Sequence, residues 1–451
     1  MRVLSDTLTA AQSGRSGISP LAKIVLTYSA NTYTYDWRRV ATSNTRLLKS
    51  THTEKQWSSP ATVVLNDSDL TLTSLDLEGY KAVISYGFTT SEGDEWSATA
   101  PLWVVGQQRD SMQGKVICSL SLEGIFDRLG KDKASATYTQ EASDTNTAKT
   151  LITAIAGATL APYTHCKAYT VTYDSEDSLI DSFIPADYFR VNLNDSRLSK
   201  IQELLGYTTC KARPENDEEI HIFTPTTTGT SYDYEYSLAD TYHTFLSKRY
   251  RRRVVSPNYI VVQNHPDQGS FTGYAKDSSA SLTDMEEREY HYARATSTAQ
   301  CASLASAILS RYQLQDERGA GILPIMNIGA EVYDYNKVTD ARAGDSVTGN
   351  VGYITRNVGG NKFGMEFGFG RASTIPLEAL AEMATGQATG YVSFDVLQQV
   401  IDSIYGNFDE ILKVMETQMW TVDSMQAFID DAHIRKLRVY EQIILPYWPG
   451  S

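Results

Sequence analysis

Short apolar segments, rich in Val, Ile, Thr and Tyr, recur along most of the first 375 residues. Gly, Pro, Asp or Ser separates them, which is the pattern of β-strands joined by turns. Between residues 21 and 130 the segments are LAKIVLTYS, NTYTYDW, ATVVLND, LTLTSLDL, YKAVISYGF, PLWVVGQQRD and GKVICSLSL. So many short strands at such close spacing predict a small β-sandwich or barrel. Residues 1–20, rich in Ser, Thr and Gly, precede it as an N-terminal arm.

The hydrophobic period changes over residues 131–230. Apolar positions recur at helical spacing in 148–160 and 196–205, and Gly206 ends the second predicted helix. The stretch that follows, YTTCKARPENDEEIHIFTP, predicts a hairpin, because PEND has the residue types of a turn. Residues 131–230 are therefore expected to form a small α+β module inserted after the first β domain.

Strand patterns return over residues 231–375 and predict a second β domain. One segment within it, TSTAQCASLASAILSRYQLQ, is predicted to be a helix, with an apolar face of Cys301, Leu304, Ala305, Ile308 and Leu309. Its small residues suit a helix that packs closely against a sheet. The fold class expected from these patterns is α+β, mainly β, with two β domains flanking the α+β module.

Residues 376–451 are predicted to be a linker followed by a helical coiled-coil segment. Apolar residues there recur in alternating steps of three and four, the spacing of a coiled-coil seam. The predicted self-association seam consists of Leu397, Ile401, Ile404, Phe408, Ile411, Met415, Gln418, Val422, Met425 and Ile429. Gln418 is its polar position, and a polar core layer can fix register and strand number. A long amphipathic helix packed on its own chain is the alternative.

The amino-acid composition of the chain limits the classes of function that it can have. The formal net charge of -14 argues against a surface devoted to nucleic-acid binding, which needs Lys and Arg to replace counterions. It suits either the acidic wall of a conduit that must not retain DNA or simple solubility. The four cysteines form no CxxC pair and indicate folding in a reducing cytoplasm. No apolar run reaches the roughly 18 residues of a membrane span, and the N-terminus lacks the apolar block of a secretory signal.

One concentrated basic cluster stands out in this acidic chain. It comprises Lys248, Arg249, Arg251, Arg252 and Arg253. Such a run can contact DNA or an acidic neighbouring subunit, and the second is the interpretation favoured for an assembly protein. The alternative is a solvated strand edge whose charges discourage aggregation.

Motifs for catalysis are missing from the sequence. It contains no HExxH zinc motif, no GxxxxGK[ST] phosphate loop and no GxSxG nucleophile elbow. Scattered acidic pairs, such as Asp67 with Asp69, are common on surfaces and define no glycosidase site. We therefore expect a structural protein with no catalytic, metal or cofactor site.

The order of these parts resembles the baseplate hub, or tail-tip, proteins of tailed bacteriophages, to which type VI secretion spike proteins are related. Three stretches carry the likeness: residues 61–88 with 102–129, similar to the family's first barrel; residues 198–225, similar to a helix and hairpin; and residues 302–315 with 337–370, similar to the closing helix and strands. The resemblance covers residues 20–371, and the C-terminal segment departs from the minimal hub pattern.

The resemblance implies that both β domains are barrels like tail-tube subunits. Three chains would form a pseudo-sixfold ring, a homotrimer that joins the sixfold tube to the central tip and lines the DNA-ejection channel. Its implied partners are distal tail or tail-tube ring proteins, a central spike or fibre, and the tape-measure protein. It would be assembled in the host cytoplasm and reside in the virion, without specific nucleic-acid binding and without a membrane span.

Two other functions fit parts of the same pattern. A peripheral receptor-binding or fibre-adapter protein of the tail shares the β content and the coiled coil, and would expose an aromatic sugar-binding surface. A carbohydrate-active enzyme on a β scaffold would need paired carboxylates, which no motif of the sequence identifies.

Overall fold

The computed structural model describes residues 2–13, 19–38, 40–238, 243–250, 255–264, 270–281, 285–315, 319–324, 326–360 and 362–370. The chain divides into two compact units, Met1–Ser373 and Thr374–Ser451. All of the described residues belong to the first unit, so the predicted C-terminal seam lies outside them. No helix among the described residues has the length and apolar character that crossing a membrane requires.

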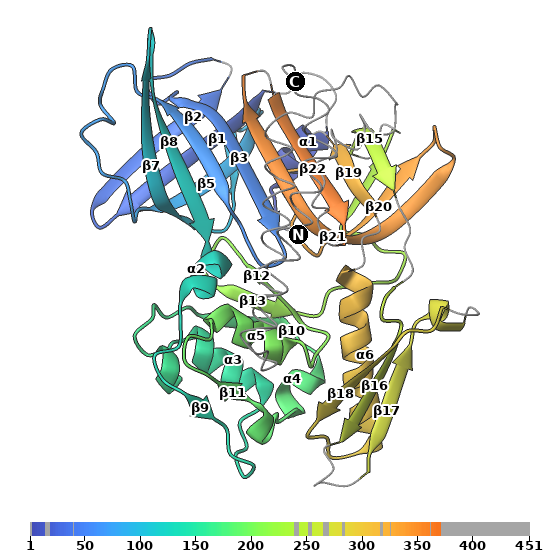
Figure 1. The fold of residues 1–451 in the computed structure, drawn as a ribbon. Helices are drawn as coiled ribbons and strands as arrows, with labels where there is room; N and C mark the ends of the chain where they lie inside the picture. The colour runs from blue at the N-terminus through green and yellow to red at the C-terminus, as the bar shows by residue number, and fades with distance from the viewer. Residues whose placement is uncertain are drawn as a thin grey trace, which may run out of the picture. The chain divides into compact units, whose positions relative to one another are not determined.

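A sheet of 14 strands forms the largest part of the first unit (Figure 1). From the N-terminal part of the chain come β1 (Pro20–Tyr28), β2 (Asn31–Arg38), β3 (Leu47–Lys55), β4 (Ala61–Asn66), β5 (Lys81–Thr90), β6 (Gly93–Ala98), β7 (Leu102–Met112) and β8 (Lys115–Gly124). From the later part come β14 (Tyr234–Ser237), β15 (Phe245–Tyr250), β19 (Gly319–Pro324), β20 (Tyr335–Asp340), β21 (Asp345–Gly359) and β22 (Lys362–Phe369). The mainly β class that the sequence predicts is confirmed.

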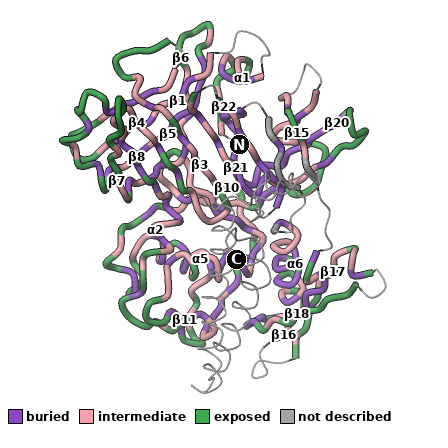
Figure 2. Tube along the Cα trace, turned by 45° about the horizontal axis from the view of Figure 1, so that its top comes forward, coloured by how far each residue is buried: buried purple, intermediate pink, exposed green. Residues whose placement is uncertain are grey.

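The two groups of strands are joined within this sheet. Its main path is β15-β19-β22-β21-β3-β4-β8-β7-β5-β1-β2, and the junction is the antiparallel pair of β3 with β21. Side chains from both groups share one apolar core, and helix α1 (Asp6–Ser13) adds Leu8 to it. Figure 2 shows buried positions along the central strands and exposed ones in the outer turns. Among the described strands, β2 and β15 end the path and do not pair with each other.

Residues 70–77, predicted to be a strand, form turns instead. The side chain of Asp67 accepts hydrogen bonds from the Leu72 amide at 2.7 Å and the Thr73 hydroxyl at 2.8 Å. This local pairing satisfies the backbone without a neighbouring strand, while Leu72 and Leu77 are buried in the core. Leu72 and Leu77 therefore anchor a turn, while Leu70 is exposed. Conversely, β3 and β6 were not predicted, because their sequences are largely polar.

A second core belongs to the α+β module. Its elements are α2 (Ile125–Lys131), β9 (Tyr138–Thr139), α3 (Ala148–Ala156), η1 (Ala161–Tyr163), β10 (Val171–Ser175), α4 (Ser178–Ser182), η2 (Ala186–Tyr188), β11 (Arg190–Val191), α5 (Arg197–Leu205), β12 (Lys211–Pro214) and β13 (Ile220–Phe223). The hydroxyl of Ser196 caps α5 by accepting from the Ser199 amide at 3.1 Å, and Gly206 ends the helix. Both predicted helices and the hairpin of β12 with β13 are confirmed.

A third core lies between a small sheet and the long helix α6 (Thr298–Gln315). The sheet has the order β17-β16-β18, formed by β16 (Tyr259–Asn264), β17 (Thr272–Lys276) and β18 (Arg288–Ala293), and η4 (Ser278–Ser281) follows β17. At Gly273 a side chain would collide with the α6 backbone at Cys301 and Ala302. The close helix–sheet packing expected from the small residues of this helix is therefore present.

Candidate functional site

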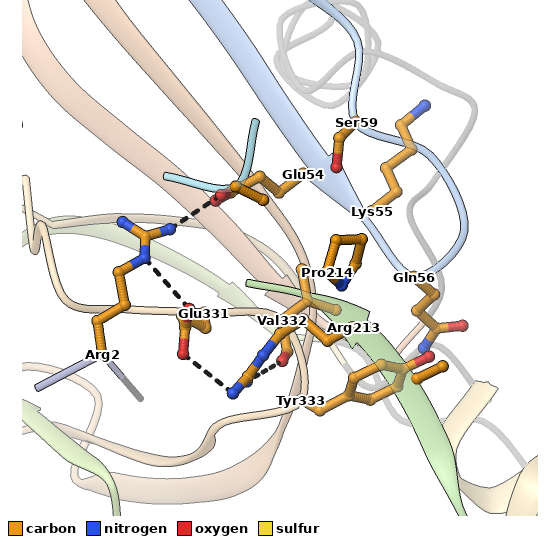
Figure 3. A pocket seen from close by; sticks show the side chains of 12 residues that line it. Arg2, Glu54, Lys55, Gln56, Ser59, Arg213, Pro214, Glu331, Val332 and Tyr333 are labelled. Atoms are coloured by element: carbon orange, nitrogen blue, oxygen red, sulfur yellow. Dashed lines mark hydrogen bonds and ion pairs between the residues drawn. The ribbon is translucent and has the colours of Figure 1, made fainter. Parts of the chain in front are cut away.

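A cluster of charged side chains lies where β3, the loop 326–334 and β12 meet (Figure 3). The loop and the N-terminal segment place their charged side chains next to charged side chains on the strands. These residues come from distant parts of the sequence. Its members are Arg2, Glu54, Arg213, Glu331, Asp334 and Arg356.

Arg2 links the N-terminal segment to both neighbouring elements. Its guanidinium donates to Glu54 Oε1 at 3.0 Å and to Glu331 Oε1 at 3.1 Å, and also to the Ile328 carbonyl at 3.1 Å. The side chain is only 8% exposed. Charge-assisted hydrogen bonds in such a position are stronger than neutral ones, so Arg2 fixes the chain's first residues to the sheet.

Arg356 and Arg213 complete the cluster from opposite sides. Arg356 on β21 is fully buried and donates to Glu54 and to the Ala330 carbonyl. Arg213 on β12 approaches Glu331 Oε2 at 3.0 Å and Asp334 Oδ1 at 3.5 Å. The cluster thereby connects the large sheet, the loop and the α+β module.

Burial and charge act in opposite directions on the acids of this cluster. Burial alone would raise the pKa of Glu54, but the guanidinium groups of Arg356 and Arg2 outweigh it and lower the pKa to about 2. For Asp334, burial dominates and raises the pKa to about 6. Burial also lowers the pKa of the neighbouring His52 to about 4. Glu54 is thus ionised and His52 neutral near pH 7.

The geometry of the cluster does not suit catalysis. The cavity beside these residues measures about 20 Å³, which has room for about one water molecule and no substrate. The arginines cannot release protons at ordinary pH, and they already occupy the carboxylates they face. The arrangement can instead fix the large sheet, the loop 326–334 and the α+β module to one another.

The structure describes only part of the predicted basic cluster. The side chain of Lys248 on β15 is 5% exposed and forms an ion pair with Asp345 of the same chain. Arg249 lies on β15, opposite Ala320 of β19. Arg251, Arg252 and Arg253 lie outside the described residues, as does the predicted self-association seam.

The structure brings together one group of possible metal ligands within its described part: Asp217, Glu219 and His221. Both nitrogens of His221 are occupied, Nδ1 by Asp174 and Nε2 by Asp217, each at 2.9 Å. Burial would lower the pKa of His221, but its hydrogen bonds to these carboxylates outweigh burial and raise it. The group is therefore satisfied as a hydrogen-bonded ion cluster without a metal.

Sequence reasoning missed the buried ion cluster. Arg2 and Glu331 lie 329 positions apart, and Arg356 and Glu54 lie 302 apart, so no local spacing connects them. An arginine within the apolar alternation of residues 345–359 was the one available signal, because charged residues are rarely fully buried unless paired.

Comparison with known proteins identifies the fold. No protein-family model matches the chain, and no curated protein matches it in sequence. Among solved structures, a tail protein from Neisseria meningitidis MC58 is 10% identical, with a TM-score of 0.54 over 77% of this chain and 96% of that one. The 43 kDa tail protein of prophage MuSo2 from Shewanella oneidensis is 10% identical, with a TM-score of 0.50 over 78% and 98% of the two chains.

These two structures are matched over nearly their whole length, and the likeness covers more than three quarters of this chain. The described fold is therefore that of phage tail proteins. The resemblance stated from the sequence is confirmed at the level of the fold.

Proposed function

We propose that this chain is the hub of a phage baseplate or tail tip, a structural virion protein without catalytic activity. The observation that carries the proposal is the tail-protein fold, which extends over 96% and 98% of the two similar chains. The continuity of the 14-stranded sheet also supports the proposed hub function. A subunit that transmits force between a tube and a tip needs its β regions in one rigid body, and the β3–β21 pair provides that connection.

In this proposal three chains form a ring that joins the sixfold tail tube to the central tip. The two β regions act as tube-like barrel domains, and the ring lines the channel through which DNA leaves the particle. The net charge of -14 suits such a channel, because an acidic wall repels the phosphates of the DNA. The proposed neighbours are distal tail or tube ring proteins, a central spike or fibre, and the tape-measure protein.

The C-terminal heptads are proposed to hold the trimer together. Light scattering of the full chain should then give about 150 kDa, three times the 50.0 kDa of one chain. Ile404→Asp, in the predicted seam, should lower that mass without changing the β-rich circular dichroism. A monomer at micromolar concentration in the unchanged protein, or an unchanged mass in the variant, would count against association through this seam.

A second candidate, a peripheral receptor-binding or fibre-adapter protein, is favoured by one surface. Tyr274 on β17 and Tyr290 and Tyr292 on β18 are 60%, 53% and 53% exposed. Tyr274 and Tyr290 both lie opposite Val261 of β16, on the face of the sheet away from α6. Aromatic platforms of this kind can stack on sugar rings. Binding on a glycan array that Tyr290→Ala abolishes would favour this function over the hub.

A further inference from the structure

A cavity of about 300 Å³ lies in the first unit beside the ion cluster, and shares Gln56 and Tyr333 with the small cavity there. It is bounded by the end of α5, the start of β12 and the C-terminal half of α6, three elements that are labelled in Figure 1. Its described lining consists of Gln56, Trp57, Gln202, Leu205, Gly206, Cys210, Lys211, Arg311, Tyr312, Leu314 and Tyr333. The volume is at the lower end of the range of small-molecule sites.

Lys211 contributes a buried cation to this cavity. The residue is 7% exposed, and among the described residues no hydrogen bond or ion pair engages its ammonium group. Burial, together with the nearby Arg311 charge, lowers the pKa of Lys211 to about 8. A buried charge without a counterion is unfavourable, and protein interiors usually pair such a group. Within the described part of the chain, Lys211 is therefore a cation without a paired anion.

Arg311 supplies a second positive charge from α6. No carboxylate pairs with it in the described part of the chain, and its guanidinium lies over the ring of Tyr312 at 5.4 Å. Gly206 makes room for it, because a Cβ at this position would lie 2.8 Å from Arg311 Nη1. The end of α5 is thus shaped to let the guanidinium approach the cavity.

The other polar groups of the lining are mainly hydrogen-bond donors or neutral amides. Tyr333 is buried, and its hydroxyl has no hydrogen-bond partner among the residues that the structure describes. Gln56 and Gln202 add side-chain amides, and none of the described lining residues is acidic. Two cations and an unused hydroxyl, with no acid in the described lining to neutralise them, form a site suited to a negative ligand.

We propose that this cavity binds an oxyanion, a carboxylate or phosphate group, between Lys211 and Arg311. The planar fork of the arginine can donate two parallel hydrogen bonds to such a group, and the lysine adds a compact point charge. The Tyr333 hydroxyl is a third donor. This site does not depend on the proposed hub function, since the residues that form it lie within one chain.

The test is calorimetric titration of the full chain with inorganic phosphate and, separately, with glutarate, in low-salt buffer at pH 7. We expect saturable binding of at least one of them, at least tenfold weaker in Lys211→Met and in Arg311→Met. The matched control is Lys115→Met, which removes an exposed charge at the start of β8 and should bind as the unchanged protein does. Preference for phosphate or glutarate tells which kind of group the site takes.

A pH titration provides an independent readout. A bound anion favours the charged form of Lys211, so binding above pH 8 should take up a proton, and affinity should fall as the pH rises through about 8. Lys211→Met should abolish this dependence. The variant removes an unpaired buried charge, so we expect it to unfold no more readily than the unchanged protein. Absence of binding by both anions, or equal binding in the folded Lys211→Met variant, would overturn the proposal.

Discussion

Arg356 on β21 donates a charge-assisted hydrogen bond to the carboxylate of Glu54 on β3, across the strand pair that joins the two parts of the large sheet. The two residues lie 302 positions apart in the sequence. Arg2 contacts the other oxygen of the same carboxylate at 3.0 Å. One acidic group thus fixes the N-terminal segment and both groups of strands, so its loss should be felt throughout the first unit.

Replacing Arg356 by Met should lower the free energy of unfolding by about 3–5 kcal/mol, because it leaves Glu54 with one of its two buried partners. Urea unfolding followed by circular dichroism measures this change. The control is Arg288→Met, whose ion pair with Glu286 is exposed to solvent and should contribute little to stability. Similar midpoints for the two variants would show that the buried pair does not hold the strands together.

Arg197 should be as important within the α+β module. Its buried guanidinium donates to the Ile155 carbonyl at 2.8 Å, to the Lys167 carbonyl at 2.8 Å and to Asp132 at 2.8 Å. Arg197→Met would remove all of these hydrogen bonds and the ion pair with Asp132. The Ile155 carbonyl would keep the Ala158 amide as a donor at 3.2 Å, but the combined loss should cost about 3 kcal/mol. Hydrogen exchange should show lost protection in α3. Arg190→Met, at an exposed position, is the control, and equal protection in both variants would contradict this role.

Because Gly273 packs closely against α6, adding a single methyl group at this position should destabilise the fold strongly. Gly273→Ala places a methyl group against the backbone of α6 at Ala302, which cannot give way as a side chain could. We expect a loss of about 2 kcal/mol or more and a displaced α6, measured by thermal unfolding and by accessibility of the Cys301 thiol. In Gly106→Ala the nearest atom lies 3.8 Å away, so that variant should be neutral. A neutral Gly273→Ala would show that α6 is not tightly packed there.

Stability should fall in mild acid because of buried histidines. Burial lowers the pKa of His52 and of His243 to about 4, so the folded chain keeps both neutral. Between pH 6.5 and 4 the unfolded chain binds protons that the folded chain does not, so this contribution is complete above pH 6.5 and lost as the pH falls to 4. Asp334, with its raised pKa of about 6, takes up a proton on folding and offsets part of the loss.

Urea midpoints at pH 7.5, 6 and 5 test this balance. The unchanged protein should lose stability toward pH 5, and His52→Gln with His243→Gln should lose most of that dependence. Below pH 4.5 both forms should weaken together, because the stability that depends on ionised Glu54 is lost as the pH falls from 4.5 toward 2. An unchanged pH dependence in the double variant would locate the sensitive groups elsewhere.

The local sequence pattern predicted helices correctly where the spacing of apolar residues and the capping residues both indicate a helix. The five apolar positions of the helix that begins near Thr298 all turn inward, and Ser196 and Gly206 bound α5 as capping residues do. The strand prediction for residues 70–77 was wrong because the side chain of Asp67 accepts a hydrogen bond from the nearby Leu72 amide and stabilises a turn. Leu72 and Leu77 reach the core from this turn. The alternation of leucines alone could not distinguish these two ways of burying them.

The sequence by itself determined the mainly β class, the helices and hairpin of the module, and the likeness to tail proteins. Each depends on residues near one another in the chain, whose spacing reports which face is buried. Only the tertiary structure decided that β3 pairs with β21, that Arg2, Glu54 and Arg356 meet, and that Lys211 and Arg311 share a cavity. These relationships join residues that are distant in sequence, and long-range pairing is set by the whole core, which no local pattern encodes.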